Sequence, residues 1–154
     1  MPLEGIEKPP NTLSNPRVNP RLKSAGAQVG VDFTGKCDRA PNTMLYHRAM
    51  DYALQKGGPA VQNDLAEKLF YMYFTAGKYP NTDNLVQALG EVGLGEQECR
   101  DYLDSDENEV TIAKSARKYS SMGVSGVPFF FFNDEPAFSG AQPPSAFLKV
   151  FETV

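Results

Sequence analysis

The sequence predicts an α+β fold in which a run of helices precedes a β-hairpin and a final helix. Three observations indicate this. Apolar residues recur at helical spacing between residues 42 and 122. Two short apolar segments, residues 129–132 and 136–138, flank a polar turn at 133–135, as expected of a hairpin. A proline pair at 143–144 then begins a last segment of helical spacing.

The amino-terminal part of the chain contrasts with this pattern. Residues 1–28 contain five prolines and little periodicity, which predicts an extended or mobile arm with at most one short helical turn. We expect residues 29–154 to form the folded domain. Residues 29–33 alternate between polar and apolar and predict a strand, and residues 34–41 predict a loop.

Helix boundaries are indicated by capping residues, glycines and prolines between residues 42 and 122. Five helices are expected: from Asn42 or Thr43 to Gly57-Gly58, from Pro59 to Gly77, from Thr82 or Asp83 through Leu89, over residues 96–103, and from Ser105 or Asn108 to Met122. The hairpin and the last helix occupy residues 126–154.

The four consecutive phenylalanines at 129–132 direct rings to both faces of the predicted sheet. A strand buried on both faces is the usual environment for such a run, so we expect an internal strand. Only residues 136–138 offer a clear partner strand. The other edge would stay open unless residues 29–33 or another molecule cover it.

Charge and hydropathy exclude several classes of function. The net charge is −4 and the 15 Lys and Arg residues are scattered, so we expect no nucleic-acid partner. The longest apolar run, residues 127–132, is far shorter than the roughly 20 residues that span a bilayer, so no membrane span is expected. Residues 1–28 lack a signal-peptide pattern, which favours a cytoplasmic protein.

The two cysteines, Cys37 and Cys99, lie 62 positions apart, which excludes a CxxC motif and paired cysteine ligands for zinc. Neither a metal nor a cofactor is expected. Lys36 and Arg39 flank Cys37 and would favour its thiolate, so Cys37 is a candidate nucleophile; the alternative is an exposed thiol with no role. Cys99 lies beside acidic residues that disfavour a thiolate, so we interpret it as structural.

Several stretches together resemble one known family. They are Pro41-Asn42-Thr43 with His47-Arg48, Leu69-Phe70, Tyr73-Phe74, the segment GVSGVPFF at 123–130, and SGAQPP at 139–144 followed by Phe147-Leu148. The pattern over residues 41–154 resembles the FrnE-like branch of the DsbA family. The resemblance implies a thioredoxin-like fold with a helical insertion, and a thiol-disulfide oxidoreductase.

The resemblance also implies a substrate site. In thioredoxin folds the backbone before a cis-proline pairs with an extended substrate, which assigns substrate binding to Val127 and Pro128 and a thiol- or disulfide-containing protein or peptide as partner. The structural alternative is a trans-proline that begins an edge strand. His47, the only histidine, is expected to pack near the start of its helix.

One part of the family pattern is missing. The family places its nucleophilic cysteine in a CxxC motif after the first strand, and this sequence has no such segment. Residues 1–5 resemble the loop after the family's second strand, so we expect a sheet incomplete on its amino-terminal side and a weakly active or inactive chain. The alternative is a non-catalytic module that binds peptides or self-assembles through the edge of residues 129–132.

Overall fold

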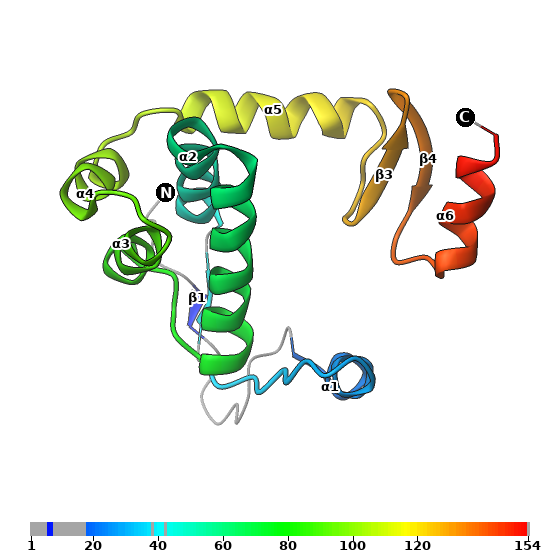
Figure 1. The fold of residues 1–154 in the computed structure, drawn as a ribbon, viewed down its shortest axis with the longest axis horizontal. Helices are drawn as coiled ribbons and strands as arrows, with labels where there is room; N and C mark the ends of the chain where they lie inside the picture. Colours follow the sequence, from blue (N-terminus) through cyan, green and yellow to red (C-terminus); the bar gives the residue numbers. More distant parts are fainter. Residues whose placement is uncertain (1–5, 8–17, 38, 42, 154) are drawn as a thin grey trace. The chain divides into compact units, whose positions relative to one another are not determined.

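The structure is a computed structural model that describes residues 6–7, 18–37, 39–41 and 43–153. The chain divides into two compact units, Met1–Ile112 and Ala113–Val154 (Figure 1).

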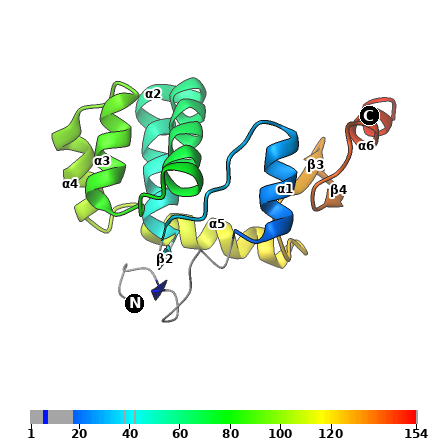
Figure 2. The same cartoon turned by 90° about the horizontal axis from the view of Figure 1, so that it is seen from below.

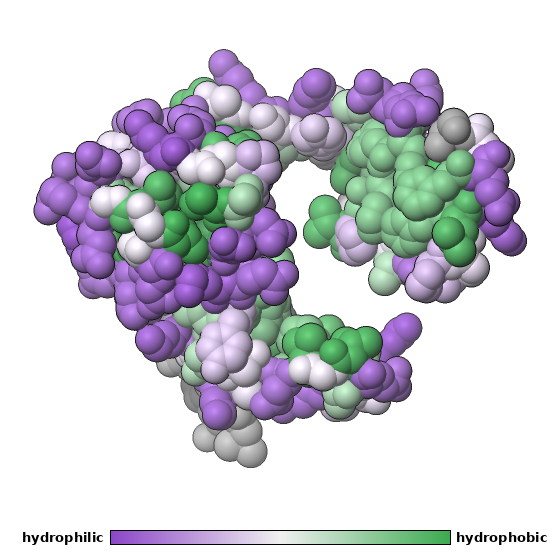
Figure 3. Space-filling view, in the orientation of Figure 1, coloured by the Kyte–Doolittle hydropathy of each residue, from purple (hydrophilic) through white to green (hydrophobic). Residues whose placement is uncertain are grey.

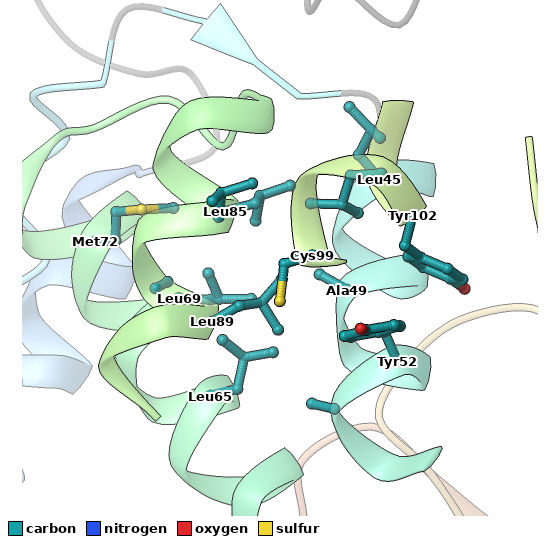
Figure 4. Close-up of a cluster of buried hydrophobic side chains, with 14 residues drawn as sticks. Leu45, Ala49, Tyr52, Leu65, Leu69, Met72, Leu85, Leu89, Cys99 and Tyr102 are labelled. Atoms are coloured by element: carbon teal, nitrogen blue, oxygen red, sulfur yellow. The ribbon is translucent and has the colours of Figure 1, made fainter. Parts of the chain in front are cut away.

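Three helices form the centre of the first unit. They are α2 (Met44–Phe70), α3 (Thr82–Glu91) and α4 (Glu96–Asp104). Both α3 and α4 lie beside α2 (Figures 1 and 2). Their apolar faces meet in one core, in which Leu65, Leu69, Leu85, Leu89 and Cys99 are fully buried (Figure 4). The core therefore consists of side chains from all three helices.

The helix boundaries follow from glycine and capping residues. Gly58 has φ 79° and ψ −175°, so α2 is two helical segments joined at a kink, and Pro59 begins the second. A π-helix, η1 (Tyr71–Ala76), continues α2 and ends at Gly77, which is left-handed. Asn81 caps α3 by accepting a hydrogen bond from the Asn84 N–H at 3.0 Å. The helices predicted over residues 42–103 are confirmed.

The amino-terminal region is more regular than predicted. Residues Pro20–Gln28 form helix α1, whose cap Asn19 accepts from the Leu22 N–H at 2.9 Å. The expected extended arm over residues 1–28 is therefore wrong for α1. Two residues of the arm, β1 (Ile6–Glu7), pair antiparallel with β2 (Arg39–Ala40). The remainder of the arm, residues 1–5 and 8–17, lies outside the described residues.

The predicted strand at residues 29–33 is also wrong. Val29 and Val31 donate their N–H groups to the carbonyl of Gly26, so the chain turns at the end of α1. The segment then binds the end of η1: Thr34 donates its N–H to Phe74 O (3.0 Å) and its hydroxyl to Thr75 O (2.8 Å). Its polar groups thus satisfy helix-terminal carbonyls, which excludes a strand ladder.

In the second unit a hairpin and a helix follow the end of α5 (Glu109–Ser121). Strands β3 (Phe129–Phe132) and β4 (Glu135–Ser139) pair antiparallel, with Phe130 opposite Phe138 and a register shift between Phe130 and Phe131. Helix α6 (Pro144–Phe151) completes the unit. The helix ending near residue 122, the hairpin and the last helix are confirmed.

These elements confirm the predicted α+β class, with helices dominating two small sheets. No helix in the described part of the chain has both the length and the apolar composition needed to cross a bilayer.

Candidate functional site

The segment that enters β3 carries the two predicted substrate-binding residues. Val127 is 88% exposed, and the peptide bond between Val127 and Pro128 is cis. The Pro128 carbonyl accepts a hydrogen bond from the Gly140 N–H at 2.8 Å, directly before the ladder of β3 and β4. Val127 is therefore a solvent-exposed residue next to a backbone position that is fixed to the hairpin.

Aromatic rings surround this entry on both faces of the hairpin. On one face α6 packs on the sheet, with ring centroids 4.9 Å apart for Phe130–Phe147 and for Phe138–Phe147. On the other face Phe131 contacts Phe129 at 5.0 Å and Tyr119 at 6.2 Å. Figure 3 shows hydrophobic side chains gathered over the hairpin and α6. The entry is thus bordered by an apolar surface of the kind that an extended apolar segment can contact.

Cys37 lies in a loop, as predicted, but it is not exposed. Its side chain is 1% exposed, and its sulfur lies 3.5 Å from Arg39 O. The loop is pressed against the end of η1, where a Cβ added at Gly77 would lie 2.5 Å from Lys36 Cβ and 3.2 Å from the Cys37 nitrogen. The predicted alternative, an exposed thiol, is therefore wrong. Burial also withholds Cys37 from a solvent-borne disulfide in this conformation.

Cys99 has the structural environment that was predicted. It is fully buried, and Figure 4 shows its sulfur among Leu69, Leu89 and Ala49. Burial raises the pKa of the Cys99 thiol, and the charges of Glu98 and Glu96 raise it further. The two cysteines are separate thiols rather than a disulfide.

Arg48 is the most deeply buried charge among the described residues, although the sequence marked it only as part of the His47-Arg48 pair of the family resemblance. Arg48 is 1% exposed and donates to three carbonyls, Tyr102 O at 2.6 Å, Leu103 O at 3.2 Å and Glu107 O at 2.9 Å. Its guanidinium thereby caps the carboxy-terminal end of α4. The adjacent His47 is exposed. Arg48 is therefore a structural residue. The neighbouring residues in the sequence gave no indication that its side chain is buried.

A groove of the first unit lies away from both cysteines. It has a volume of about 570 Å³ between α2, η1 and α3, with Met72 and Ala88 in its lining and the Lys68–Glu91 ion pair (3.0 Å) beside it. It contains neither cysteine of the chain. Within the described residues, no group of three or more His, Cys, Asp or Glu side chains is arranged to hold a metal ion.

Comparison with known proteins identifies the family. Residues 4–152 match the family described as DSBA-like thioredoxin domain. The chain belongs to this family. DsbA-like proteins are thiol-disulfide oxidoreductases that act on thiol substrates. The family resemblance found over residues 41–154 is thus confirmed at the level of the DsbA family.

A solved structure supports the same fold. A probable DsbA oxidoreductase from Streptomyces coelicolor is similar with a TM-score of 0.76 and 23% sequence identity, over 86% of this chain and 57% of that protein. This chain therefore spans a little over half the length of that DsbA protein. No curated protein sequence matches the chain.

Proposed function

We propose that this chain is the substrate-facing part of a DsbA-type thiol-disulfide oxidoreductase of the FrnE-like branch. In this proposal an extended, thiol- or disulfide-containing peptide binds along the backbone at Val127 and Pro128. We propose the cytosol as its compartment, because free thiols such as those of Cys37 and Cys99 are the usual state of cysteines in a reducing compartment.

The observation that carries the proposal is the exposure of Val127 beside an anchored strand. Val127 is 88% exposed, whereas the next carbonyl, that of Pro128, is bonded to Gly140. An exposed backbone held in place by a neighbouring strand needs little ordering when a peptide adds to it. Main-chain hydrogen bonds supply the affinity in such strand addition, so this step requires no cysteine.

The burial of both thiols supports a chain that binds a substrate without catalysing disulfide exchange. The attacking species in disulfide exchange is a thiolate that reaches the disulfide. Cys99 is fully buried with a raised pKa, and Cys37 is 1% exposed. Since the sequence has no CxxC motif, we propose weak or no redox activity for the chain alone, with Cys37 as the candidate nucleophile for any residual activity.

A redox assay tests this part of the proposal. Insulin reduction and dithiol oxidation would be measured for the parent chain, Cys37→Ser and Cys99→Ser. We expect no turnover that depends on either cysteine. Turnover that disappears in Cys37→Ser but persists in Cys99→Ser would make Cys37 the nucleophile and overturn the inactive assignment.

A binding assay tests the peptide site. Fluorescence anisotropy would follow a labelled extended peptide that contains a cysteine. Val127→Pro removes one main-chain N–H, and the loss of one hydrogen bond of about 1.4 kcal/mol corresponds to about tenfold weaker binding. Val127→Ala keeps the backbone and is the matched control. Equal affinities for the two variants would contradict strand addition at Val127.

The second candidate is a non-catalytic module that binds peptides or assembles with itself. One observation favours it: no described residue of the second unit is buried, although the unit contains seven phenylalanines between residues 129 and 151. An apolar surface of this kind is typical of interaction sites, whether or not the chain performs redox chemistry.

A further inference from the structure

The groove between α2, η1 and α3 has the features of a ligand site. Its volume is about 570 Å³, and all of its lining residues belong to the first unit. Ligand sites commonly have about this size, with an apolar lining and a few polar groups. Met72 and Ala88 supply apolar parts of the lining, and the ring of Tyr71 beside them is 64% exposed. The groove therefore offers apolar side chains at a surface that solvent reaches.

The rim of the groove is charged, and one ion pair on it is already complete. Lys68 Nζ lies 3.0 Å from Glu91 Oε2, and Gln87 donates its amide to Glu91 Oε1 at 3.0 Å. These two hydrogen bonds lower the pKa of Glu91, and the charge of Lys78 lowers it further. Lysine and glutamate side chains are almost never buried unless they are paired. The charged rim therefore favours a groove that stays open to solvent over a face that another part of a fold covers.

Two charges of the lining are left for a ligand. Among the described residues, neither Glu67 nor Lys78 has a partner of opposite charge. They lie eleven positions apart along α2 and η1, so a rise of about 1.5 Å per residue puts their backbones at most about 16 Å apart. A single amino acid carries its two charges too close together to reach both. About three residues of extended chain span about 10 Å, and the flexible side chains of Glu67 and Lys78 cover the remainder.

We propose that this groove binds a short apolar peptide by its two free ends. The terminal ammonium of the peptide pairs with Glu67, and its terminal carboxylate pairs with Lys78. Its apolar side chains lie against Met72 and Ala88. The ligand class is therefore a zwitterionic peptide of about three residues.

The walls of the groove suit the rest of such a peptide. Asn84 and Gln87 use their amide N–H groups on Tyr79 O (2.7 Å) and on Glu91, so their amide oxygens can accept from peptide N–H groups. Met72 has a flexible thioether that adapts to side chains of different shape. It is carried by the π-helix η1, a rare conformation that is frequent at functional sites. The groove thus selects the length and the free ends of a peptide more than its sequence.

This inference goes beyond the proposed function. The groove contains neither thiol and no part of the Val127 segment, so its ligand needs no cysteine. Failure of the peptide site at Val127 would leave the groove site standing, and the reverse also holds.

The test compares trileucine with two blocked forms on the intact chain. N-acetyl-trileucine lacks the ammonium, and trileucine amide lacks the carboxylate. Heteronuclear NMR titration measures the affinity and locates the binding from the amides that shift. Trileucine is expected to shift amides of η1 and α3. Each blocked form is expected to bind about threefold to fivefold more weakly, the effect of one solvated ion pair.

Charge-removing variants assign each end of the peptide. Lys78→Met should weaken trileucine by the same factor but bind trileucine amide as the parent does, because that contact is already absent. Glu67→Gln should show the same behaviour with N-acetyl-trileucine. Lys56→Met removes an exposed lysine of α2 outside the groove and is the matched control.

Three outcomes would overturn the inference. The first is equal affinity of the parent for all three peptides, and the second is the absence of shifts in η1 and α3. The third is a loss in Lys78→Met that is the same for trileucine and its amide, which would give the lysine a structural role only.

Discussion

Arg48 shows how one side chain determines the geometry of the helical unit. Its guanidinium is enclosed by protein and donates to the carbonyls of Tyr102, Leu103 and Glu107. The carbonyls of Tyr102 and Leu103 lie in the last turn of α4, where a helix leaves carbonyl groups unsatisfied and partially negative, and Glu107 lies just after that helix. Arg48 therefore joins α2 to the end of α4 through main-chain contacts.

Replacement of Arg48 should be among the most destabilising changes in the chain. Arg48→Met keeps the length of the aliphatic stem but removes the guanidinium donor from three carbonyls, of which Tyr102 O keeps a second donor, the Ser105 hydroxyl (2.7 Å). We expect a loss of about 3 kcal/mol in the free energy of unfolding. The matched control is Arg100→Met, which removes an exposed ion pair with Asp83 (2.8 Å) and should cost less than about 1 kcal/mol. Urea unfolding measures both. Equal losses in the two variants would show that the buried contacts of Arg48 contribute nothing special.

We predict that Tyr46 makes the stability of the folded chain depend on pH in the alkaline range. Its hydroxyl is buried without a hydrogen-bond partner in the described structure, and burial raises the pKa of Tyr46 to about 12. The folded state thus favours the neutral phenol. This contribution to stability is complete below pH about 10, where an unfolded tyrosine begins to ionise, and is lost as the pH rises toward about 12.

Tyr46→Phe should remove that dependence. Parent and variant are expected to have similar unfolding free energies at neutral pH, because the phenol makes no hydrogen bond to lose. Between pH 10 and pH 12 the parent should lose more stability than Tyr46→Phe, as measured by denaturant unfolding at a series of pH values. Tyr71→Phe, on an exposed tyrosine of η1, is the control. Parallel pH profiles for parent and Tyr46→Phe would refute the role of burial.

The sequence predicted a residue's environment correctly where neighbouring residues create that environment, and not where distant residues do. Acidic neighbours correctly indicated a structural Cys99, and the structure adds burial as the larger cause of its raised pKa. Lys36 and Arg39 suggested a reactive or exposed Cys37, but its burial comes from the end of η1, about 40 positions later in the chain. The carbonyls that hold Arg48 are likewise distant in sequence. Neither environment follows from neighbouring residues.

At the scale of elements, glycines and caps located most helices correctly. Gly58 and Gly77 take positive φ values where the predicted helices end, and the hairpin turn has the expected residues. The failure at residues 29–33 has a physical cause. Alternation predicts a strand only when a neighbouring strand is available, and here the carbonyls at the ends of α1 and η1 took the hydrogen bonds instead.

The kink of α2 at Gly58 allows a prediction about the stability of that helix. Gly58→Ala adds a Cβ at φ 79°, where an L-residue is strained, and is expected to cost about 1–2 kcal/mol in unfolding free energy. Gly126→Ala has open space around its Cβ and no positive φ, so it should change stability little. Thermal unfolding of both variants measures the difference. A neutral Gly58→Ala would mean that α2 straightens at little cost.

At the scale of the whole molecule, the two units are built differently. The first has a continuous core of leucines and aromatic residues from α2, α3 and α4. The second has aromatic contacts without a buried side chain. Because stability follows burial, the first unit should open only by global unfolding, whereas the hairpin should open locally.

Hydrogen exchange on the intact protein tests this difference. At low protein concentration, amides around Leu69 and Leu89 should exchange only through global unfolding, at a cost typical of small domains of about 5–15 kcal/mol. Amides of β3 should exchange far faster. Strong protection of β3 in a dilute monomer would instead mean that its edge is already covered within one chain.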